Sequence, residues 1–213
     1  MLTRHRGFDP VLAGAPARLM RSDGVEVGLT PHRWRSDAGG EDGWLLNRCA
    51  GPVLDLGCGP GRLVAALTAR GLPALGVDVS AVAQRHCRRR RAAMVRRDVF
   101  DPLPGEGTWG HVLLADGNIG IGGDPLRLLR RCTALLHPGG TVLVETDPRP
   151  DALWRGSVRV CTGRGTGAPL PWASAGADAL TRLAAALGLR RTGSYAGLRS
   201  FVELTVGQPA RAG

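Results

Sequence analysis

Short apolar runs alternate with segments of helical periodicity through the middle of the chain. Residues 52–56 (PVLDL) form an apolar run that ends at a cluster of glycines, as a buried parallel strand does. Residues 62–70 then place apolar side chains at helical spacing, and Gly71 suits the end of that helix. Residues 74–79 (ALGVDV) predict a second strand, and Ser80 is a suitable N-cap for the next helix. The pattern therefore predicts a strand–helix–strand unit.

The same alternation continues toward the C-terminus. Five further strands are predicted, at residues 94–99, 111–116, 141–146, 190–196 and 200–206. A helix beginning at Asp124 and Pro125 and another at residues 178–188 separate them. Strands that alternate with helices imply a parallel sheet with right-handed crossovers. We predict an α/β fold: a Rossmann-like, doubly wound, mostly parallel seven-stranded sheet with helices on both faces.

Composition excludes several classes of protein. Hydrophobic residues make up 43% of the chain and charged residues 22%, as in folded globular proteins. No apolar run approaches the roughly 18 residues of a membrane span, and the basic N-terminus is not followed by the apolar stretch of a secretory signal. Five cysteines without a C-x-x-C motif predict neither disulfides nor a zinc site, and we expect no metal. These features predict a cytoplasmic protein that does not bind membranes.

The net charge of +10 by itself favours a nucleic-acid partner. However, all 28 residues counted as Lys or Arg are arginines, which together with 32 Gly and 15 Pro indicates the bias of a GC-rich coding sequence. The densest run, residues 85–97, falls on a predicted helix and its exit loop. Aromatic residues, which stack on bases, make up only 4% of the chain. We expect a solvated helix face and no specific nucleic-acid site.

The segment VLDLGCGPG, residues 53–61, carries the strongest chemical signal. Its glycines, Gly57, Gly59 and Gly61, allow the backbone to approach a ligand closely, and the following helix N-terminus offers free N–H groups to an anion. The dinucleotide fingerprint G-x-G-x-x-G would need glycine where the chain has Arg62. The tighter spacing suits a ligand with an amino-acid carboxylate better than a pyrophosphate, and disfavours a nicotinamide cofactor.

VLDLGCGPGRL resembles the first motif of the class I S-adenosylmethionine-dependent methyltransferases, and the resemblance continues in order to about Glu145, nearly half the chain. In that family, an acid after the second strand, here Asp78, binds the ribose hydroxyls, since a carboxylate can accept two hydrogen bonds from a diol. Asp98 resembles the acid that accepts from the adenine amino group. Asp116 corresponds to the position that faces the methionine end and the acceptor.

The resemblance implies S-adenosyl-L-methionine as cofactor and S-adenosyl-L-homocysteine as product. The residues that it implies for cofactor binding are Asp55, Gly57, Cys58, Gly59, Gly61, Asp78, Val79, Asp98, Val99 and Asp116. Candidate catalytic residues are Asp116, Asn118 and Glu145. The exit at residues 116–123 lacks the prolines and aromatic residue of the Asp/Asn-Pro-Pro-aromatic motif of amino-group methyltransferases, so N-methylation is not inferred.

We expect one methyltransferase domain in four parts. They are an N-terminal cap segment, a cofactor-binding half, a substrate-covering insertion, and a closing helix with two strands, at residues 1–50, 51–147, 148–177 and 178–213. Within the first part, helices are predicted near residues 10–20 and 41–50, whereas the third part fits no regular element. Because ligands in such sheets bind beyond the carboxyl ends of the strands, Trp34 and Trp172 are candidates to wall a substrate pocket there, with core packing as the alternative.

The predicted function is methyl transfer to a small molecule by in-line displacement driven by positioning. A general base is needed only when the acceptor must lose a proton. The acceptor and the oligomeric state stay open. Methylation of RNA or protein is the alternative favoured by the arginine excess, and a non-catalytic S-adenosylmethionine-binding protein is a second alternative.

Overall fold

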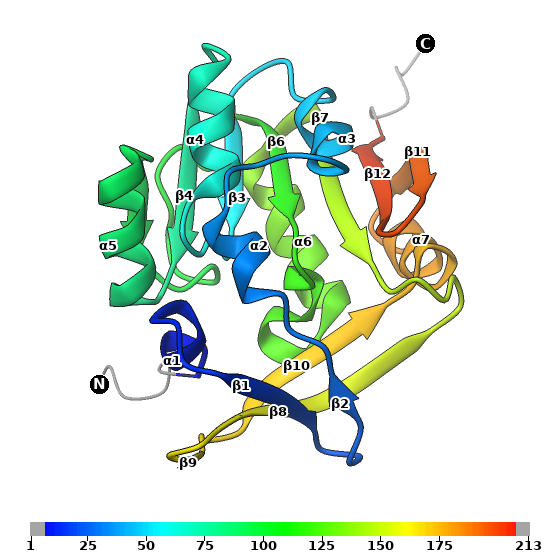
Figure 1. Ribbon diagram of the computed structural model, residues 1–213. Helices are drawn as coiled ribbons and strands as arrows, with labels where there is room; N and C mark the ends of the chain where they lie inside the picture. Colours follow the sequence, from blue (N-terminus) through cyan, green and yellow to red (C-terminus); the bar gives the residue numbers. More distant parts are fainter. Residues whose placement is uncertain (1–6, 208–213) are drawn as a thin grey trace, which may run out of the picture.

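The computed structural model describes residues 7–207, and a seven-stranded sheet forms its core (Figure 1). The strand order is β11-β12-β7-β6-β3-β4-β5. The bounds are β3 (Val53–Leu56), β4 (Ala74–Asp78), β5 (Met94–Arg96), β6 (Trp109–Leu114), β7 (Leu136–Thr146), β11 (Leu189–Ala196) and β12 (Ser200–Val206). Only β12 runs against its neighbours; the other six strands are parallel. The predicted mostly parallel sheet is confirmed.

Helices cover both faces of this sheet. The four longer ones are α4 (Arg62–Ala69), α5 (Ala81–Arg90), α6 (Pro125–Leu135) and α7 (Ala177–Ala185). Successive residues of β6 point to opposite faces: Val112 and Leu114 pack with α6 and α7, and Leu113 packs with α4 and the short helix α3 (Asp42–Leu46). Both faces are therefore apolar, which explains why these strands appear in the sequence as continuous apolar runs.

The helix ends follow the predicted local chemistry. The Ser80 hydroxyl accepts hydrogen bonds from the backbone N–H groups of Val82 and Ala83 at the start of α5. Asp124 does the same at the start of α6, where Pro125 is the first helical residue. Gly71, with φ +80°, follows the end of α4. The side chains of Ser80 and Asp124 thus satisfy N–H groups that the first turn of a helix leaves without a partner.

Residues 148–177 are not irregular, and the prediction that they fit no regular element is wrong. A second, antiparallel sheet has the order β10-β8-β1-β2, with β9 paired to β8. Its strands are β1 (Ala17–Arg21), β2 (Glu26–Val27), β8 (Leu153–Thr162), β9 (Gly165–Thr166) and β10 (Leu170–Ala175). Figure 1 shows this sheet beyond one end of the main sheet, beside α1 and α2.

The N-terminal prediction also needs correction. The helix expected near residues 10–20 is only α1 (Asp9–Leu12), and β1 occupies the rest. In β1 only Leu19 is buried, so the strand carries no alternating pattern of its own. It is stabilised by pairing with β8, for example Leu19 opposite Val160, more than a hundred residues away. The helix expected near residues 41–50 is present as the shorter α3.

No helix within residues 7–207 is long and apolar enough to cross a membrane.

Candidate functional site

The glycine-rich turn between β3 and α4 requires its glycines. Gly57, Gly59 and Gly61 all have positive φ angles, of 75°, 50° and 78°. A Cβ atom on Gly57 would stand 2.6 Å from Nδ2 of Asn118, and one on Gly61 would stand 2.7 Å from Sγ of Cys87. The backbone conformation therefore disfavours side chains at all three positions, and close neighbours add to this at Gly57 and Gly61. The turn presents bare backbone at the carboxyl end of β3.

Asp78, the last residue of β4, is bound to this turn. Its Oδ2 accepts a hydrogen bond from the Gly59 N–H at 3.0 Å, and Oδ1 accepts one from the Ser80 N–H at 2.8 Å. Burial raises the pKa of Asp78, against the effect of these hydrogen bonds. Two carboxylate oxygens offer about four acceptor sites, so acceptor capacity is left for the hydroxyls of a diol. Loop and carboxylate together fit a ribose-bearing ligand.

The other residues implied for the cofactor lie along the same edge of the sheet. β3, β4 and β5 are adjacent and parallel, so their carboxyl ends meet there. Asp98 follows β5 and accepts from the Phe100 N–H at 3.0 Å. Val99 and Cys58 are buried, and Val79 is half-buried beside Asp78. A hydrogen bond with Cys87, together with burial, raises the pKa of the Cys58 thiol, which keeps it uncharged.

Asp55 differs from the acids at the strand ends because it lies inside β3 and is 3% exposed. Burial raises its pKa to about 7, although the positive charge of Arg62 opposes the shift. A carboxyl in such surroundings takes its ionised form reluctantly, because a low-dielectric interior disfavours charge.

Asp116 lies in a group of alternating charges that we name the charge network. It comprises three arginines and three acids: Arg33, Arg62, Arg199, Asp42, Asp116 and Glu145. Arg62 binds Asp42 and, at 2.7 Å, Oδ2 of Asp116. Arg33 donates to Oδ1 of Asp116 from Nε and from Nη2, at 3.1 and 2.7 Å. Arg199 joins Asp42 to Glu145, with its Nε 2.8 Å from Oε1 of Glu145.

The network decides the charge of Asp116. Burial acts to raise its pKa, but Arg62, followed by Arg33 and Arg199, outweighs burial and the pKa is lowered. Arg62 itself is 3% exposed and Asp42 is 2% exposed. Sequence reasoning used Arg62 only to exclude a dinucleotide site and missed Arg33, Arg199 and Asp42. Their partners are 20 to 157 residues away in the chain, so no regular spacing connects them.

Two of the three candidate catalytic residues, Asp116 and Glu145, are in direct contact. The backbone N–H of Asp116 donates to Glu145, which fixes the ends of β6 and β7 against each other. Asn118 has a different position: its Nδ2 donates to the carbonyl oxygens of Leu56 and Gly57, both at 2.9 Å. Asn118 therefore fastens the 3-10 helix η1 (Asn118–Gly123) to the glycine-rich turn.

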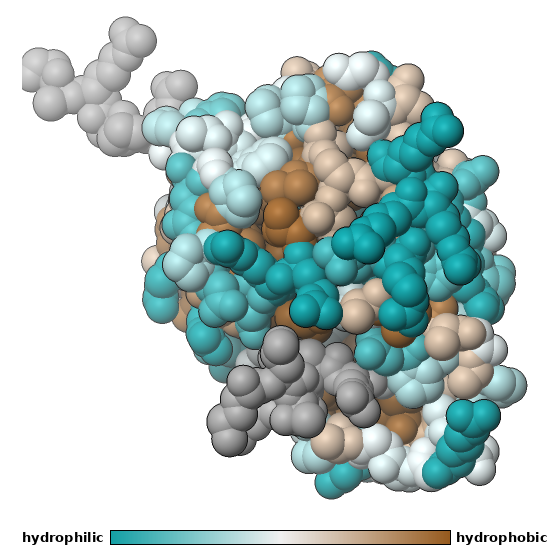
Figure 2. Space-filling model, turned by 90° about the vertical axis from the view of Figure 1, so that its left-hand side faces the viewer, coloured by the Kyte–Doolittle hydropathy of each residue, from teal (hydrophilic) through white to brown (hydrophobic). Residues whose placement is uncertain are grey.

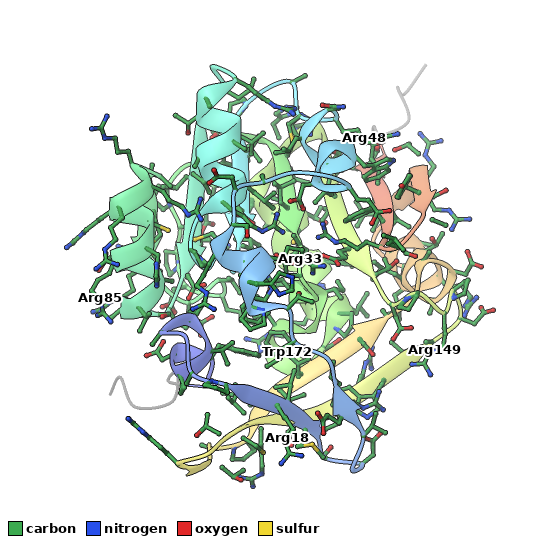
Figure 3. All side chains as sticks on the ribbon, viewed as in Figure 1. Arg18, Arg33, Arg48, Arg85, Arg149 and Trp172 are labelled. Carbon is green, nitrogen blue, oxygen red and sulfur yellow. The ribbon has the colours of Figure 1, made fainter. Side chains whose placement is uncertain are left out.

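A cavity of about 480 Å³ opens beside Asp116 and Glu145, between the main sheet and the second sheet. Four aromatic side chains line it: Phe8, Trp34, Trp154 and Trp172. Arg33 and Trp34, consecutive residues of α2 (Pro31–Arg35), line it together with Trp172 on β10; Figure 3 labels Arg33 and Trp172. The ring centroids of Phe8 and Trp172 are 5.3 Å apart, and those of Phe8 and Trp34 are 6.3 Å apart. Both predicted pocket tryptophans thus border the same cavity as Asp116.

The glycine-rich exit after β6 is packed against Trp172. A Cβ atom on Gly120 would stand 2.4 Å from Nε1 of Trp172 and 2.2 Å from the carbonyl oxygen of Ala173. The absence of a side chain at this position lets β10 lie directly on η1. The glycines here therefore bring the second sheet close to the end of β6.

The arginine-rich run lies elsewhere. Arg85, Arg88 and Arg89 are exposed on α5, and Arg85 points away from the body of the molecule (Figure 3). Hydrophilic side chains cover much of the face that carries α5 (Figure 2). None of residues 85–97 lines the cavity beside Asp116. Among residues 7–207, no group of three His, Cys, Asp or Glu side chains could hold a metal ion.

This chain is similar to known methyltransferases. A family model described as "Methyltransferase domain" matches residues 42–191. A ubiquinone biosynthesis O-methyltransferase of Methylococcus capsulatus is 34% identical over 103 residues, 44% of this chain and 42% of that protein. A trans-aconitate 2-methyltransferase of Paracidovorax citrulli is 35% identical over 136 residues, 61% of this chain and 50% of that protein. The matched part thus spans half or less of each of these two relatives.

Solved structures show the same fold. A SAM-dependent methyltransferase from Bacteroides fragilis, in complex with S-adenosyl-L-homocysteine, superposes with a TM-score of 0.75 at 20% identity, over 93% of this chain and 95% of that one. A 1,6-didemethyltoxoflavin-N1-methyltransferase from Burkholderia thailandensis superposes with a TM-score of 0.54 at 21% identity, over 78% and 75% of the two chains.

Proposed function

This chain belongs to the methyltransferase domain family, and we propose that it transfers the methyl group of S-adenosylmethionine to a small-molecule acceptor. The relatives that support the proposal include one named for the biosynthesis of a small molecule, ubiquinone, and one named for methylation of a small molecule, trans-aconitate.

One arrangement carries the proposal. The hydrogen bond between Gly59 and Asp78 makes a cradle of bare backbone and carboxylate, and the cavity beside Asp116 begins at the neighbouring strand end. A cofactor site and an acceptor site must adjoin for a group to pass between them. In an open α/β sheet that point lies beyond the carboxyl ends of the strands, where both features lie here.

The division of labour among residues follows from this arrangement. When bound, S-adenosylmethionine supplies a methyl group already activated on a sulfonium. The glycine-rich turn and Asp78 would hold the cofactor, with Asp55, Cys58, Val79, Asp98 and Val99 around it. Asp116 and Glu145, both engaged by arginines, would hold the reacting end in place, and the aromatic side chains would exclude water. Well-oriented reactions gain about 7–11 kcal/mol from positioning.

The first test is calorimetric titration with S-adenosyl-L-homocysteine. Asp78→Ala should weaken binding at least tenfold, because the variant loses the carboxylate proposed to bind the ribose. The matched control is Asp101→Ala, an exposed acid of the same half, which should bind as the wild type does. Asp78→Asn keeps an acceptor for the Gly59 N–H, so it serves if Asp78→Ala does not fold.

Unchanged affinity in a folded Asp78 variant would refute the assignment of this residue. Displacement of S-adenosyl-L-homocysteine by a stoichiometric amount of NAD would refute the cofactor itself, which the G-x-G-x-G spacing and Arg62 argue against.

Compartment and nucleic-acid binding also belong to the proposal. We propose a cytoplasmic location, which is supported by the five cysteines because all of them are free thiols. The α5 arginines are expected to attract polyanions only weakly and at low salt, because counterion release favours any cluster of cations. Their position outside the cavity lining gives no support to methylation of RNA.

A further inference from the structure

Four of the nine aromatic residues of this chain line one cavity. The chain has five Trp, three Phe and one Tyr, and three of the tryptophans and one phenylalanine line the cavity beside Asp116. Aromatic rings bury much area and stack on other rings with offset or edge-to-face geometry. A cavity that collects them in this way is suited to a flat, apolar occupant.

The register of the second sheet aligns part of this wall. Trp172 pairs with Gly156, and Ser174 pairs with Trp154, so both indoles project from the same face of the sheet. A Cβ atom on Gly156 would stand 2.6 Å from Cζ2 of Trp154. The Trp154 ring therefore lies across the glycine that separates it from Trp172. Residues two apart on one strand share a face, and directly opposing residues of an antiparallel pair do so too, which puts Trp154, Gly156 and Trp172 on one face of the sheet.

The charges around the cavity are balanced within the protein. Each charged side chain of its lining has an oppositely charged partner; the pairs are Arg21 with Asp23, Glu26 with Arg18, Arg33 with Asp116, Glu145 with Arg199, and Asp147 with Arg149. The pairs nearest the main sheet are part-buried and hydrogen-bonded, whereas that between Arg18 and Glu26 is exposed. A charged occupant would find no unpaired counter-ion, and a buried charge without one is costly.

We propose that the acceptor is an uncharged, planar aromatic or heteroaromatic molecule that binds against the wall formed by Trp34 and Trp172, a proposal that rests on the proposed function; the Trp154 ring beside them is covered by the Arg21 guanidinium, 4.0 Å from the ring centroid. The cavity volume of about 480 Å³ lies within the range of small-molecule sites. Trp172 and Trp34 are specificity residues in this scheme, because they meet the occupant's ring and leave the cofactor cradle untouched.

The test uses three bicyclic probes in calorimetric titrations at neutral pH with saturating S-adenosyl-L-homocysteine. The first is 2-naphthol, which is neutral and planar; the second is 2-naphthoate, planar and anionic; the third is decahydro-2-naphthol, neutral and not planar. We expect 2-naphthol to bind at least tenfold more tightly than either of the others. If 2-naphthol binds no more tightly than 2-naphthoate, the proposal that the acceptor is uncharged is wrong. If 2-naphthol and decahydro-2-naphthol bind with equal affinity, the proposal that the acceptor is planar is wrong.

A variant locates the binding. Trp172→Leu should weaken 2-naphthol binding at least fivefold and leave the affinity for S-adenosyl-L-homocysteine unchanged. Trp109→Leu is the matched control, since Trp109 starts β6 and does not line the cavity. If Trp172→Leu does not fold, Trp34→Leu in the short helix α2 replaces it. Undiminished 2-naphthol binding in the folded variant contradicts the proposal.

The titrations also separate the two proposals. If the wild type does not bind S-adenosyl-L-homocysteine, the proposed function is refuted. If it binds S-adenosyl-L-homocysteine but shows no preference among the three probes, only the proposal of an uncharged, planar acceptor is refuted.

Discussion

The half of this molecule that we propose to bind the cofactor (the cofactor half) and the side that we propose to bind the acceptor (the acceptor side) are built in different ways. The cofactor half uses backbone and strand-end carboxylates, such as the Gly59 N–H on Asp78, placed by adjacent parallel strands. The acceptor side uses large side chains from separate segments, with Phe8, Trp34 and Trp172 meeting around one cavity. The first design depends on a local strand–turn–helix geometry, while the second exists only once distant segments have packed together.

Two acids at neighbouring strands show what this difference means electrostatically. Asp55 lies inside β3, and burial raises its pKa to about 7. Asp116 follows β6 and is also buried, but Arg62, Arg33 and Arg199 outweigh that burial and its pKa is lowered. Arg62 acts on both acids, yet donates hydrogen bonds only to Asp116 and Asp42. Direct contact with arginine, more than depth of burial, explains why the pKa of Asp116 is lowered while that of Asp55 is raised.

The largest effect is expected where Arg62 joins the two regions. Arg62→Met removes the most deeply buried arginine that contacts both Asp42 and Asp116. Among residues 7–207, Arg199 is then the one arginine that still reaches both acids. Breaking a buried ion pair from one side costs about 3–5 kcal/mol, so the free energy of unfolding should fall by about that amount in urea denaturation. Arg130→Met, at an exposed arginine, should change it by less than about 0.5 kcal/mol. If the free energy of unfolding falls by much less than this in Arg62→Met, Arg33 and Arg199 are sufficient to compensate the charges of Asp42 and Asp116.

A pH series sharpens the contrast between Asp55 and Asp116. Because the pKa of Asp55 is about 7 in the folded protein and 3.8 ordinarily, the folded state retains a proton that the unfolded state has released. Its contribution to the free energy of unfolding therefore falls as pH rises from about 4 to about 7. Asp55→Asn should be more stable than the wild type above pH 7, by up to about 4 kcal/mol at about 1.4 kcal/mol per pKa unit.

This stability advantage should shrink as the pH falls toward 4. Urea denaturation at several pH values measures it, with Asp101→Asn as the exposed control. Asp116 has the opposite sign: its lowered pKa stabilises the folded state above its ordinary pKa, and that stability is lost as pH falls through the lowered value. Parallel pH curves for Asp55→Asn and the wild type would contradict the shift assigned to Asp55.

The smallest effect concerns the contact between η1 and the second sheet. Gly120→Ala would place a Cβ atom 2.2 Å from the Ala173 carbonyl oxygen and 2.4 Å from the Trp172 indole. Overpacking of this kind costs about 1–3 kcal/mol, and we expect such a loss together with weaker 2-naphthol binding. Gly43→Ala is the control: it lies in α3 with no atom within 4 Å, and should be neutral or stabilising by about 0.5–1 kcal/mol. Full 2-naphthol affinity in Gly120→Ala would show that the acceptor wall tolerates movement of β10.

Much of the fold could be predicted because its signals are local. The caps at Ser80 and Asp124 depend on residues two or three positions away, and the buried strands appear as short apolar runs. The second sheet was missed because a strand such as β1 buries a single residue. Val158 and Val160 in β8 do alternate with exposed Arg159, which was the one available sign.

The sequence alone predicted the edge that we propose to hold the cofactor, because a parallel sheet brings the ends of neighbouring strands together, and Gly57, Asp78 and Asp98 follow or end such strands. Only the tertiary structure decided the charge network and the cavity that we propose to hold the acceptor. Arg199 reaches Asp42 across 157 positions, and β1 pairs with β8 across more than a hundred. Such contacts depend on how whole elements pack, and that packing leaves no regular spacing in the chain from which the partners could be identified.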